Sequence, residues 1–250
     1  MTDTFPAGWH AADGCLKDKV ILVTGAGDGI GRACAREYAR LGATVLLLGR
    51  TQEKLEAVYD EIKAAGGREP GMIPLNLAIA MPNDYEQLAG MLEKEFGRLD
   101  ALVHCAAILG DITPLEIYSA DTWQQVLQTN LTAPAFLTQA MIPLLKAAPS
   151  ASVVFVSSSV GRKGRAFWGA YAVSKAGIES LTQILADEME NVARIRFNAV
   201  NPGATRTTMR ARAYPAENPM TVKTPEALMP LFIWLVSNDS TGISGRSFDA

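Results

Sequence analysis

Residues Val20-Ile-Leu-Val-Thr-Gly-Ala-Gly-Asp-Gly-Ile-Gly31 make the first regular unit of this chain. The unit begins with an apolar run of the kind that fills a buried parallel strand. Glycines follow at positions 25, 29 and 31, and a helical pattern begins at Ile30. Glycine lets the backbone turn sharply and approach a pyrophosphate, whose charge a helix N-terminus stabilises. The unit therefore predicts a strand, a dinucleotide-binding turn and a helix; the alternative is a strand–helix turn without a ligand.

The same alternation of short apolar runs and longer helical patterns continues along the chain. Strands are expected at Val20–Val23, Thr44–Leu48, Met72–Leu75, Ala101–Val103, Val153–Val156 and Ile195–Val200, with Arg246–Asp249 as a further candidate. Helices are expected at Gly29–Leu41, Gln52–Ala65, Asn83–Phe96, Asp121–Leu145, Tyr171–Asn191 and Pro225–Val236. Strand–helix alternation of this kind forms right-handed βαβ units with helices on both sheet faces. The predicted fold class is α/β, a single-domain Rossmann-type doubly wound parallel sheet of about seven strands.

Composition narrows the class of protein further. The chain has 250 residues, is 48% hydrophobic and carries a formal charge of −3, which suits one large core and gives no support to nucleic-acid binding. No apolar stretch reaches the roughly 18 to 20 residues of a membrane helix. Residues 1–18 lack a signal-peptide pattern and are expected to form a loose N-terminal arm, with Trp9 docking on the domain at 19–250. Three widely spaced cysteines are expected to be free thiols, and two histidines leave little material for a metal site. We expect a cytoplasmic protein.

A second pattern, Tyr171-Ala-Val-Ser-Lys175, puts a phenol and an ammonium on one helix face, because residues i and i+4 are neighbours there. An adjacent cation favours the phenolate and lowers the phenol pKa toward the range in which a general acid or base works. Ser158 comes just past an expected strand and should lie in the same crevice, since ligands bind beyond the C-terminal strand ends. Ser157 and Ser159 are alternatives to Ser158, and a core aromatic without a chemical role is the alternative for the tyrosine.

Together, Thr24-Gly25-x-x-x-Gly29-Ile30-Gly31 and Tyr171-x-x-x-Lys175 resemble the short-chain dehydrogenase/reductase family, over residues 18–249. The resemblance implies an oxidoreductase that interconverts a carbonyl compound and an alcohol by hydride transfer from a nicotinamide cofactor. It implies that Tyr171 donates the proton, while Lys175 lowers the pKa of Tyr171 and holds the nicotinamide ribose. Ser158 would stabilise the developing alkoxide, and Asn130 would hold a water that relays protons toward Lys175. A packing role is the alternative for Asn130.

The resemblance also implies cofactor contacts and an assembly. The residues expected to bind the cofactor are Gly25, Gly27, Asp28, Gly29, Ile30, Gly31, Arg50, Asn76, Leu77, Ala106, Tyr171, Lys175, Pro202, Gly203, Thr205 and Thr207. A homodimer or homotetramer is expected to pack through the two helices Asp121–Leu145 and Tyr171–Asn191. Within the family, Ser157–Tyr171, Thr205-Arg-Thr207 and Ser247-Phe-Asp-Ala250 resemble the bacterial YciK-type oxidoreductases. Relatives of this type are expected to continue past Phe-Asp-Ala, so the chain is expected to be truncated or simply shorter.

The end of the second strand indicates which nicotinamide cofactor binds. NAD-dependent proteins place a carboxylate there to accept hydrogen bonds from the ribose hydroxyls, whereas this chain has Gly49 followed by Arg50. A guanidinium can pair bidentately with a 2′-phosphate, so NADP(H) is favoured over NAD(H). Asp28 argues the other way because it lies in the turn near that phosphate, and a solvated role is the alternative for Arg50. Asn76 replaces the usual aspartate of the family but can still accept the adenine amino group.

One segment departs from the family pattern. His104-Cys-Ala-Ala107 stands where Asn-Asn-Ala-Gly or His-Asn-Ala-Gly is usual. The asparagine normally ties neighbouring strands together, and the glycine leaves room for the adenosine ribose. Because Cys105 is a weak hydrogen-bonding group and Ala107 adds a methyl, we expect weaker cofactor binding or lower stability, with function retained.

Two segments, 161–169 and 206–224, are expected to face the substrate. They carry the cationic and aromatic residues Arg162, Lys163, Arg165, Phe167, Trp168, Arg206, Arg210, Arg212, Tyr214 and Lys223. This enrichment favours a small molecule with an acidic group and an apolar body; surface charge or subunit-interface pairs are the alternative. Two rival functions are an isomerase or epimerase that uses the same tyrosine, and a non-catalytic NADP(H)-binding sensor or scaffold.

Overall fold

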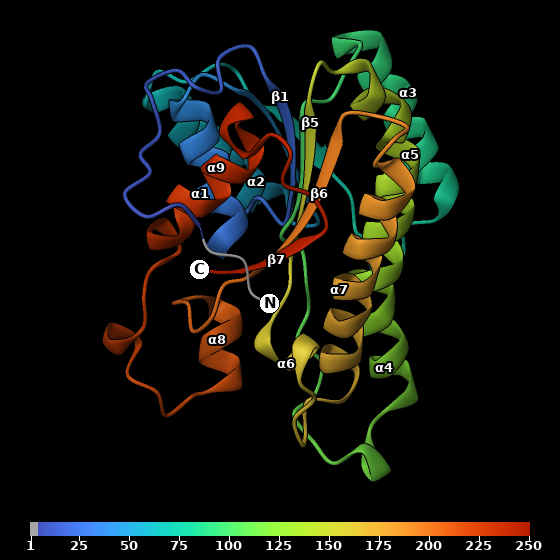
Figure 1. The fold of residues 1–250 in the computed structure, drawn as a ribbon. Helices are drawn as coiled ribbons and strands as arrows, with labels where there is room; N and C mark the ends of the chain where they lie inside the picture. The colour runs from blue at the N-terminus through green and yellow to red at the C-terminus, as the bar shows by residue number, and fades with distance from the viewer. Residues whose placement is uncertain (1–4) are drawn as a thin grey trace.

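The computed structural model describes residues 5–250, and in this range the strands form one seven-stranded sheet (Figure 1). The strand order is β3-β2-β1-β4-β5-β6-β7, and all neighbours are parallel. The strands are β1 (Val20–Thr24), β2 (Thr44–Gly49), β3 (Gly71–Pro74), β4 (Ala101–His104), β5 (Ala151–Val156), β6 (Ile195–Asn201) and β7 (Arg246–Asp249). The predicted doubly wound sheet is confirmed. The direction of winding reverses between β1 and β4, where such sheets bind ligands.

Helices cover both faces of the sheet (Figure 1). One face carries α1 (Gly29–Arg40), α2 (Gln52–Ala64) and α9 (Met229–Val236). The other carries α3 (Pro82–Phe96), α4 (Ala120–Leu127), α5 (Ala133–Ala147) and α7 (Gly169–Met189). Two short helices, α6 (Ser159–Arg162) and α8 (Thr208–Ala213), were missed by the sequence analysis because four and six residues are too few for a periodic pattern. Within the described range, no helix has the length and apolar character needed to cross a membrane.

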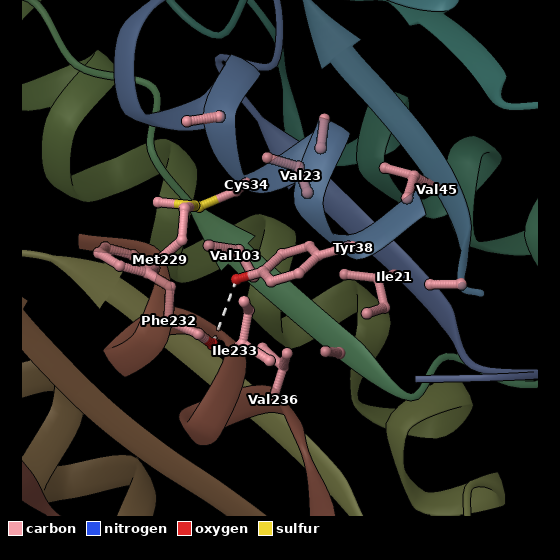
Figure 2. Packing of buried hydrophobic residues seen from close by; sticks show 14 of the residues in the cluster. Ile21, Val23, Cys34, Tyr38, Val45, Val103, Met229, Phe232, Ile233 and Val236 are labelled. Atoms are coloured by element: carbon pink, nitrogen blue, oxygen red, sulfur yellow. Dashed lines mark hydrogen bonds between the residues drawn. The ribbon is translucent and has the colours of Figure 1, made fainter. Parts of the chain in front are cut away.

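The core beneath α1 and α9 shows why the strands read as continuous apolar runs (Figure 2). Strand side chains meet helix side chains in one dry layer, made by Ile21, Val23, Val45, Val103, Cys34, Tyr38, Met229, Phe232, Ile233 and Val236. Tyr38 is fully buried, and its hydroxyl donates to the Phe232 carbonyl oxygen at 3.4 Å. The phenol therefore joins α1 to α9 without leaving its only polar atom unpaired.

Two predicted helices are interrupted in the structure. The predicted helix Asp121–Leu145 is α4 and α5 joined by a π-helical turn, Gln128–Thr132, which contains Asn130. Single π turns of this kind often occur at functional sites. The predicted helix Pro225–Val236 begins as a 3-10 turn, Pro225–Leu228, before α9. Further 3-10 turns lie at Leu115–Ile117, Pro219–Thr221 and Asn238–Ser240.

The N-terminal arm packs on the body from residue 5 onward, while residues 1–4 lie outside the described residues. Trp9 Nε1 donates to Asp239 Oδ2 at 2.9 Å, which confirms the expected docking of this residue. The Phe5 ring packs edge-on against Trp234 at 5.7 Å between centroids, and Leu16 is fully buried. Residues 5–18 form no helix or strand and are mostly exposed, but these aromatic and leucine side chains anchor them by burying apolar area, and the looseness of the arm stays a prediction. A domain boundary after residue 18 stays a prediction.

Candidate active site

A cavity of about 470 Å³ lies at the C-terminal edge of the sheet. Its walls come from the β1–α1 turn, the segments after β2, β3, β4, β5 and β6, and helices α7 and α8. Every residue expected to bind the cofactor lines this cavity, and so does Ser158. Asn130 alone among the expected catalytic residues does not line it. The strand order therefore brings together residues that are far apart in the chain.

The glycines of the β1–α1 turn are required by close backbone contacts. A Cβ atom on Gly31 would lie 2.3 Å from the Gly25 carbonyl oxygen, and one on Gly25 would lie 2.9 Å from the Ala106 backbone. Gly25 and Gly29 also have positive φ angles of 67° and 51°. With these side chains absent, the first turn of α1 meets the cavity directly, and its backbone N–H groups and dipole favour an anion there. The turn fits the pyrophosphate of a dinucleotide.

Asp28 caps α1 and is itself neutralised by a lysine. Its Oδ1 accepts from Gly29 N at 2.7 Å, and its Oδ2 lies 2.8 Å from Lys54 Nζ. The hydrogen bond from Lys54 is the main reason that the pKa of Asp28 is lowered. Lys54 also lines the cavity, as does the exposed Arg50. The sequence analysis missed Lys54, although a cation in the first turn of α2 opposes the helix dipole and so signals another role.

Tyr171, Lys175 and Ser158 meet at the end of β5. Tyr171 is 9% exposed and Lys175 is 2% exposed, both on the sheet-facing side of α7. Lys175 Nζ donates to the Val156 carbonyl oxygen at 2.7 Å and lies 5.6 Å from the centre of the Tyr171 ring. The Ser158 hydroxyl lies near the phenol, close enough to act on its pKa as a hydrogen-bond partner. The predicted juxtaposition of these three side chains is present.

The protonation states differ from the expectation. Burial raises the pKa of Tyr171 to about 12, and the hydrogen bond with Ser158 lowers it by less. Burial also lowers the pKa of Lys175 to about 8, against the opposing influence of Cys105 and Glu179. These values give no support to an acidic phenol, because loss of water around the phenolate outweighs the nearby ammonium, and the prediction that Lys175 lowers the pKa of Tyr171 stays a prediction. The phenol is protonated at neutral pH.

The side chain of Asn130 forms hydrogen bonds with the backbone of the loop after β4. Its Nδ2 donates to the Ile108 carbonyl oxygen at 2.9 Å and to Ser174 Oγ at 3.2 Å, while its Oδ1 accepts from Ile108 N at 2.8 Å. Both amide hydrogens are therefore used. The geometry gives the side chain a role in fixing the loop after β4 against α7, and gives no support to a side-chain water relay.

The three consecutive serines have separate environments. Ser158 faces the phenol, whereas Ser157 is 1% exposed and donates to Glu179 Oε1 at 2.5 Å. Ser159 is exposed and does not line the cavity. Of the three, Ser158 is the hydroxyl that can reach a group bound beside Tyr171.

The segment 104–107, which departs from the family pattern, makes contacts with the core and the cavity. His104 is buried, with Nε2 2.9 Å from Thr138 Oγ1 and its ring stacked on Phe155 at 4.9 Å. Cys105 lines the cavity, and it helps to raise the pKa of the buried Cys34 thiol on α1 after the larger effect of burial. Ala107 also lines the cavity, and the crowding by its methyl stays a prediction. The effect on cofactor affinity stays a prediction.

The remaining wall of the cavity is aromatic and partly cationic. Trp168 packs at 5.7 Å from Tyr171 and at 6.1 Å from Tyr214, and these rings line the cavity with Arg210 and Arg212. Arg210 is bound to Glu217 at 2.6 Å and stacks on Tyr214 at 3.7 Å. The other cations of the two expected substrate segments do not line the cavity: Arg162, Lys163, Arg165, Arg206 and Lys223.

Comparison with known proteins agrees with this geometry. The family model described as short chain dehydrogenase matches residues 19–218. The chain therefore belongs to the short-chain dehydrogenase family of oxidoreductases. It is 49% identical over 235 residues to the oxidoreductase YciK of Escherichia coli (strain K12), a match that covers 94% of this chain and 92% of YciK.

Solved structures with the same fold also belong to short chain dehydrogenases. A short chain dehydrogenase from Pseudomonas syringae is 53% identical, with a TM-score of 0.95, over 96% of this chain and 98% of its own. A short chain dehydrogenase from Escherichia coli CFT073, solved in complex with NADPH, is 48% identical with a TM-score of 0.92, over 95% of this chain and 99% of its own. The resemblance to the family and to its YciK-type members is thus confirmed.

Proposed function

We propose that this chain is an NADP(H)-dependent oxidoreductase that interconverts a carbonyl compound and a primary or secondary alcohol. The observation that carries the proposal is the meeting of Tyr171, Lys175 and Ser158 in one cavity with the glycine turn of β1–α1. A phosphate-binding turn and a proton donor are the two parts that hydride transfer to a carbonyl needs from a protein.

The preference for NADP(H) rests on charge at the adenosine end of the cavity. Arg50 and Lys54 are cations there, and Asp28 is an anion that Lys54 already neutralises. The objection that Asp28 would repel a 2′-phosphate is therefore weakened, because one positive charge remains in excess. The NADPH complex of the Escherichia coli CFT073 relative supports the same choice.

The mechanism follows from the states of the side chains. When bound, the nicotinamide supplies the hydride. Tyr171 holds a proton at neutral pH, since its pKa is about 12, and gives it from Oη to the carbonyl oxygen. Ser158 Oγ donates to the same oxygen as charge develops on it. Lys175, still mostly cationic at neutral pH, stabilises the phenolate left behind and binds ribose hydroxyls through Nζ. Asn130 keeps the loop at Ile108 against α7, so that this wall of the site stays closed.

The test is a screen of aldehydes, ketones and secondary alcohols with NADPH and NADH. Tyr171→Phe should lower turnover by about 10² to 10⁴-fold, as expected for loss of a general acid, while calorimetry shows unchanged NADPH binding. Tyr59→Phe, which removes a hydroxyl outside the cavity, serves as the matched control. Tight NADPH binding without turnover of any compound would favour the sensor or scaffold, and product formed without net NADPH consumption would favour the isomerase.

The substrate class and the assembly are part of the same proposal. Trp168 and Tyr214 suit an apolar or aromatic body, and Arg212, which has no ion-pair partner among the described residues, suits an acidic group. An enzyme indifferent to a carboxylate on its substrate would contradict the acidic group. Helices α5 and α7 cover the same face of the sheet and expose Phe136 (42%), Val173 (48%) and Ile184 (50%), which supports a homodimer or homotetramer packed through them (Figure 1). Sedimentation of a monomer at micromolar concentration would contradict the assembly.

A further inference from the structure

A third residue on the catalytic face of α7 holds the serine segment, and the mechanism above does not use it. Tyr171, Lys175 and Glu179 follow one another at steps of four, so they lie along one face of the helix. Tyr171 meets the Ser158 hydroxyl, Lys175 binds the carbonyl oxygen of Val156, and Glu179 accepts from Ser157 Oγ at 2.5 Å. Three consecutive residues at the end of β5 are thus each held by one side chain of this face.

Arg162 pairs with the same Glu179 carboxylate oxygen that Ser157 binds. The side chain of Glu179 is only 13% exposed, and a carboxylate with so little water needs partners. Arg162 Nε lies 3.4 Å from Glu179 Oε1, and Arg162 Nη1 lies 2.8 Å from Asp249 Oδ1. The helix that carries Arg162 is pressed against the catalytic lysine, since a Cβ atom on Gly161 would lie 2.7 Å from the Lys175 carbonyl carbon. Glu179, Arg162 and Asp249 therefore form one charged cluster behind the serine segment.

Asp249 extends the cluster to the loop after β6. Its Oδ1 accepts from Asn201 Nδ2 at 2.7 Å, and Asn201 Oδ1 accepts from Gly203 N at 3.2 Å. Gly203 lines the cavity. Arg162 adds contacts to the same strand, with Nη2 at 2.7 Å from Ser247 Oγ and 3.1 Å from the Phe248 carbonyl oxygen. One carboxylate on β7 thus joins the serine segment to a loop of the proposed cofactor site.

The cluster also acts on the charge of Lys175. The titratable groups around its ammonium are Tyr171 and Glu179 on α7, His104 at the end of β4, and Cys105 directly after it. Burial lowers the pKa of Lys175, and Cys105 and then Glu179 oppose that shift. The Glu179 carboxylate therefore contributes to keeping Lys175 protonated over a wider pH range than burial alone would allow.

We propose that Glu179, held by Arg162 and Asp249, is a positioning residue of this active site. It fixes Ser157, and through the adjacent peptide the Ser158 hydroxyl, and it preserves the charge of Lys175. The kinetic test of this inference rests on the proposed function. The NADPH-binding test is independent of turnover. It also gives a physical reason why the Ser157–Tyr171 stretch and the Ser247–Ala250 stretch occur together in one chain.

The test compares Glu179→Gln with Glu188→Gln, an exposed carboxylate farther along α7. Glu179→Gln should lower kcat by about 10- to 100-fold with little change in KM, as expected when a reacting group is misplaced. The alkaline limb of kcat against pH, and the midpoint above which NADPH affinity falls, should both move to lower pH. Glu188→Gln should leave all of these unchanged. A wild-type kcat with unshifted pH midpoints in Glu179→Gln would overturn the proposal.

A double-mutant cycle keeps the proposal testable if Glu179→Gln proves unstable. Ser157→Ala should reproduce most of the loss in kcat, and the double variant should lose little more, because both act through one contact. Multiplicative losses would overturn the proposal. Asp249→Asn should lower kcat and also weaken NADPH binding through the Asn201–Gly203 loop. Should no carbonyl compound be turned over by the wild type, the proposed function fails, while the pH midpoint of NADPH binding still decides the role of Glu179.

Discussion

The buried imidazole of His104 makes the stability of this protein sensitive to acid. The side chain is 3% exposed, and its Nδ1 has no hydrogen-bond partner among the described residues. Burial, followed by the charge of Lys175, lowers the pKa of His104 from 6.5 to about 3. Protonation in the folded chain would bury a cation beside another cation, so the imidazole stays neutral until the pH is very low.

The sign and size of the effect follow from linkage. The folded pKa lies below the unfolded one, so the unfolded chain binds this proton more readily as the pH falls. The stability that depends on neutral His104 is therefore complete above pH 6.5 and lost as the pH falls from 6.5 toward 3. With these two pKa values, the free energy of unfolding should decrease by about 2 kcal/mol between pH 7 and pH 5, and by about 3 kcal/mol by pH 4.

Urea denaturation at pH 7, 5 and 4, followed by tryptophan fluorescence at fixed protein concentration, measures this loss. His104→Gln should be less stable than wild type at pH 7, because the ring packing is lost, but its stability should decrease less with acid. His10→Gln is the matched control, since His10 is the other of the two histidines and is exposed. The carboxylates are the same in all three proteins, so the difference in pH dependence between the variants isolates the effect of His104. Parallel pH dependence of wild type and His104→Gln would refute the reasoning.

Three further predictions concern the cofactor and the core. Arg50→Gln and Lys54→Gln should each weaken NADPH binding by about 10-fold or more, as for loss of a hydrogen bond to a charged group. Calorimetry with NADH as the comparison checks this, and equal losses for both cofactors would contradict it. Ala107→Gly should tighten NADPH binding by about 2- to 10-fold, since a crowding methyl is removed; an unchanged or higher Kd speaks against crowding. Phe232→Ala should lower the free energy of unfolding by about 3 to 5 kcal/mol in urea, whereas a loss below about 1 kcal/mol would mean that the layer in Figure 2 is not tightly packed.

Much of the fold could be predicted because it depends on local patterns. The six apolar runs and the further candidate Arg246–Asp249 became the seven strands of the described sheet. The long helices were also found, within a few residues of their ends. The π turn at Gln128–Thr132 was not predictable, since the amide of Asn130 that accompanies it binds Ile108, a residue distant in the chain. Short helices such as α6 are stabilised by neighbours and leave no periodic signal.

The sequence by itself determined that the residues expected to bind the cofactor reach the cavity, because residues just after parallel strands must lie at the C-terminal edge of the sheet. It also determined that Tyr171 and Lys175 share a helix face, since helical spacing is a local property. Only the tertiary structure decided their protonation, the neutralisation of Asp28 by Lys54, and the cluster of Glu179, Arg162 and Asp249. Those features depend on burial and on charges brought together from separate elements, and both arise only when the chain packs.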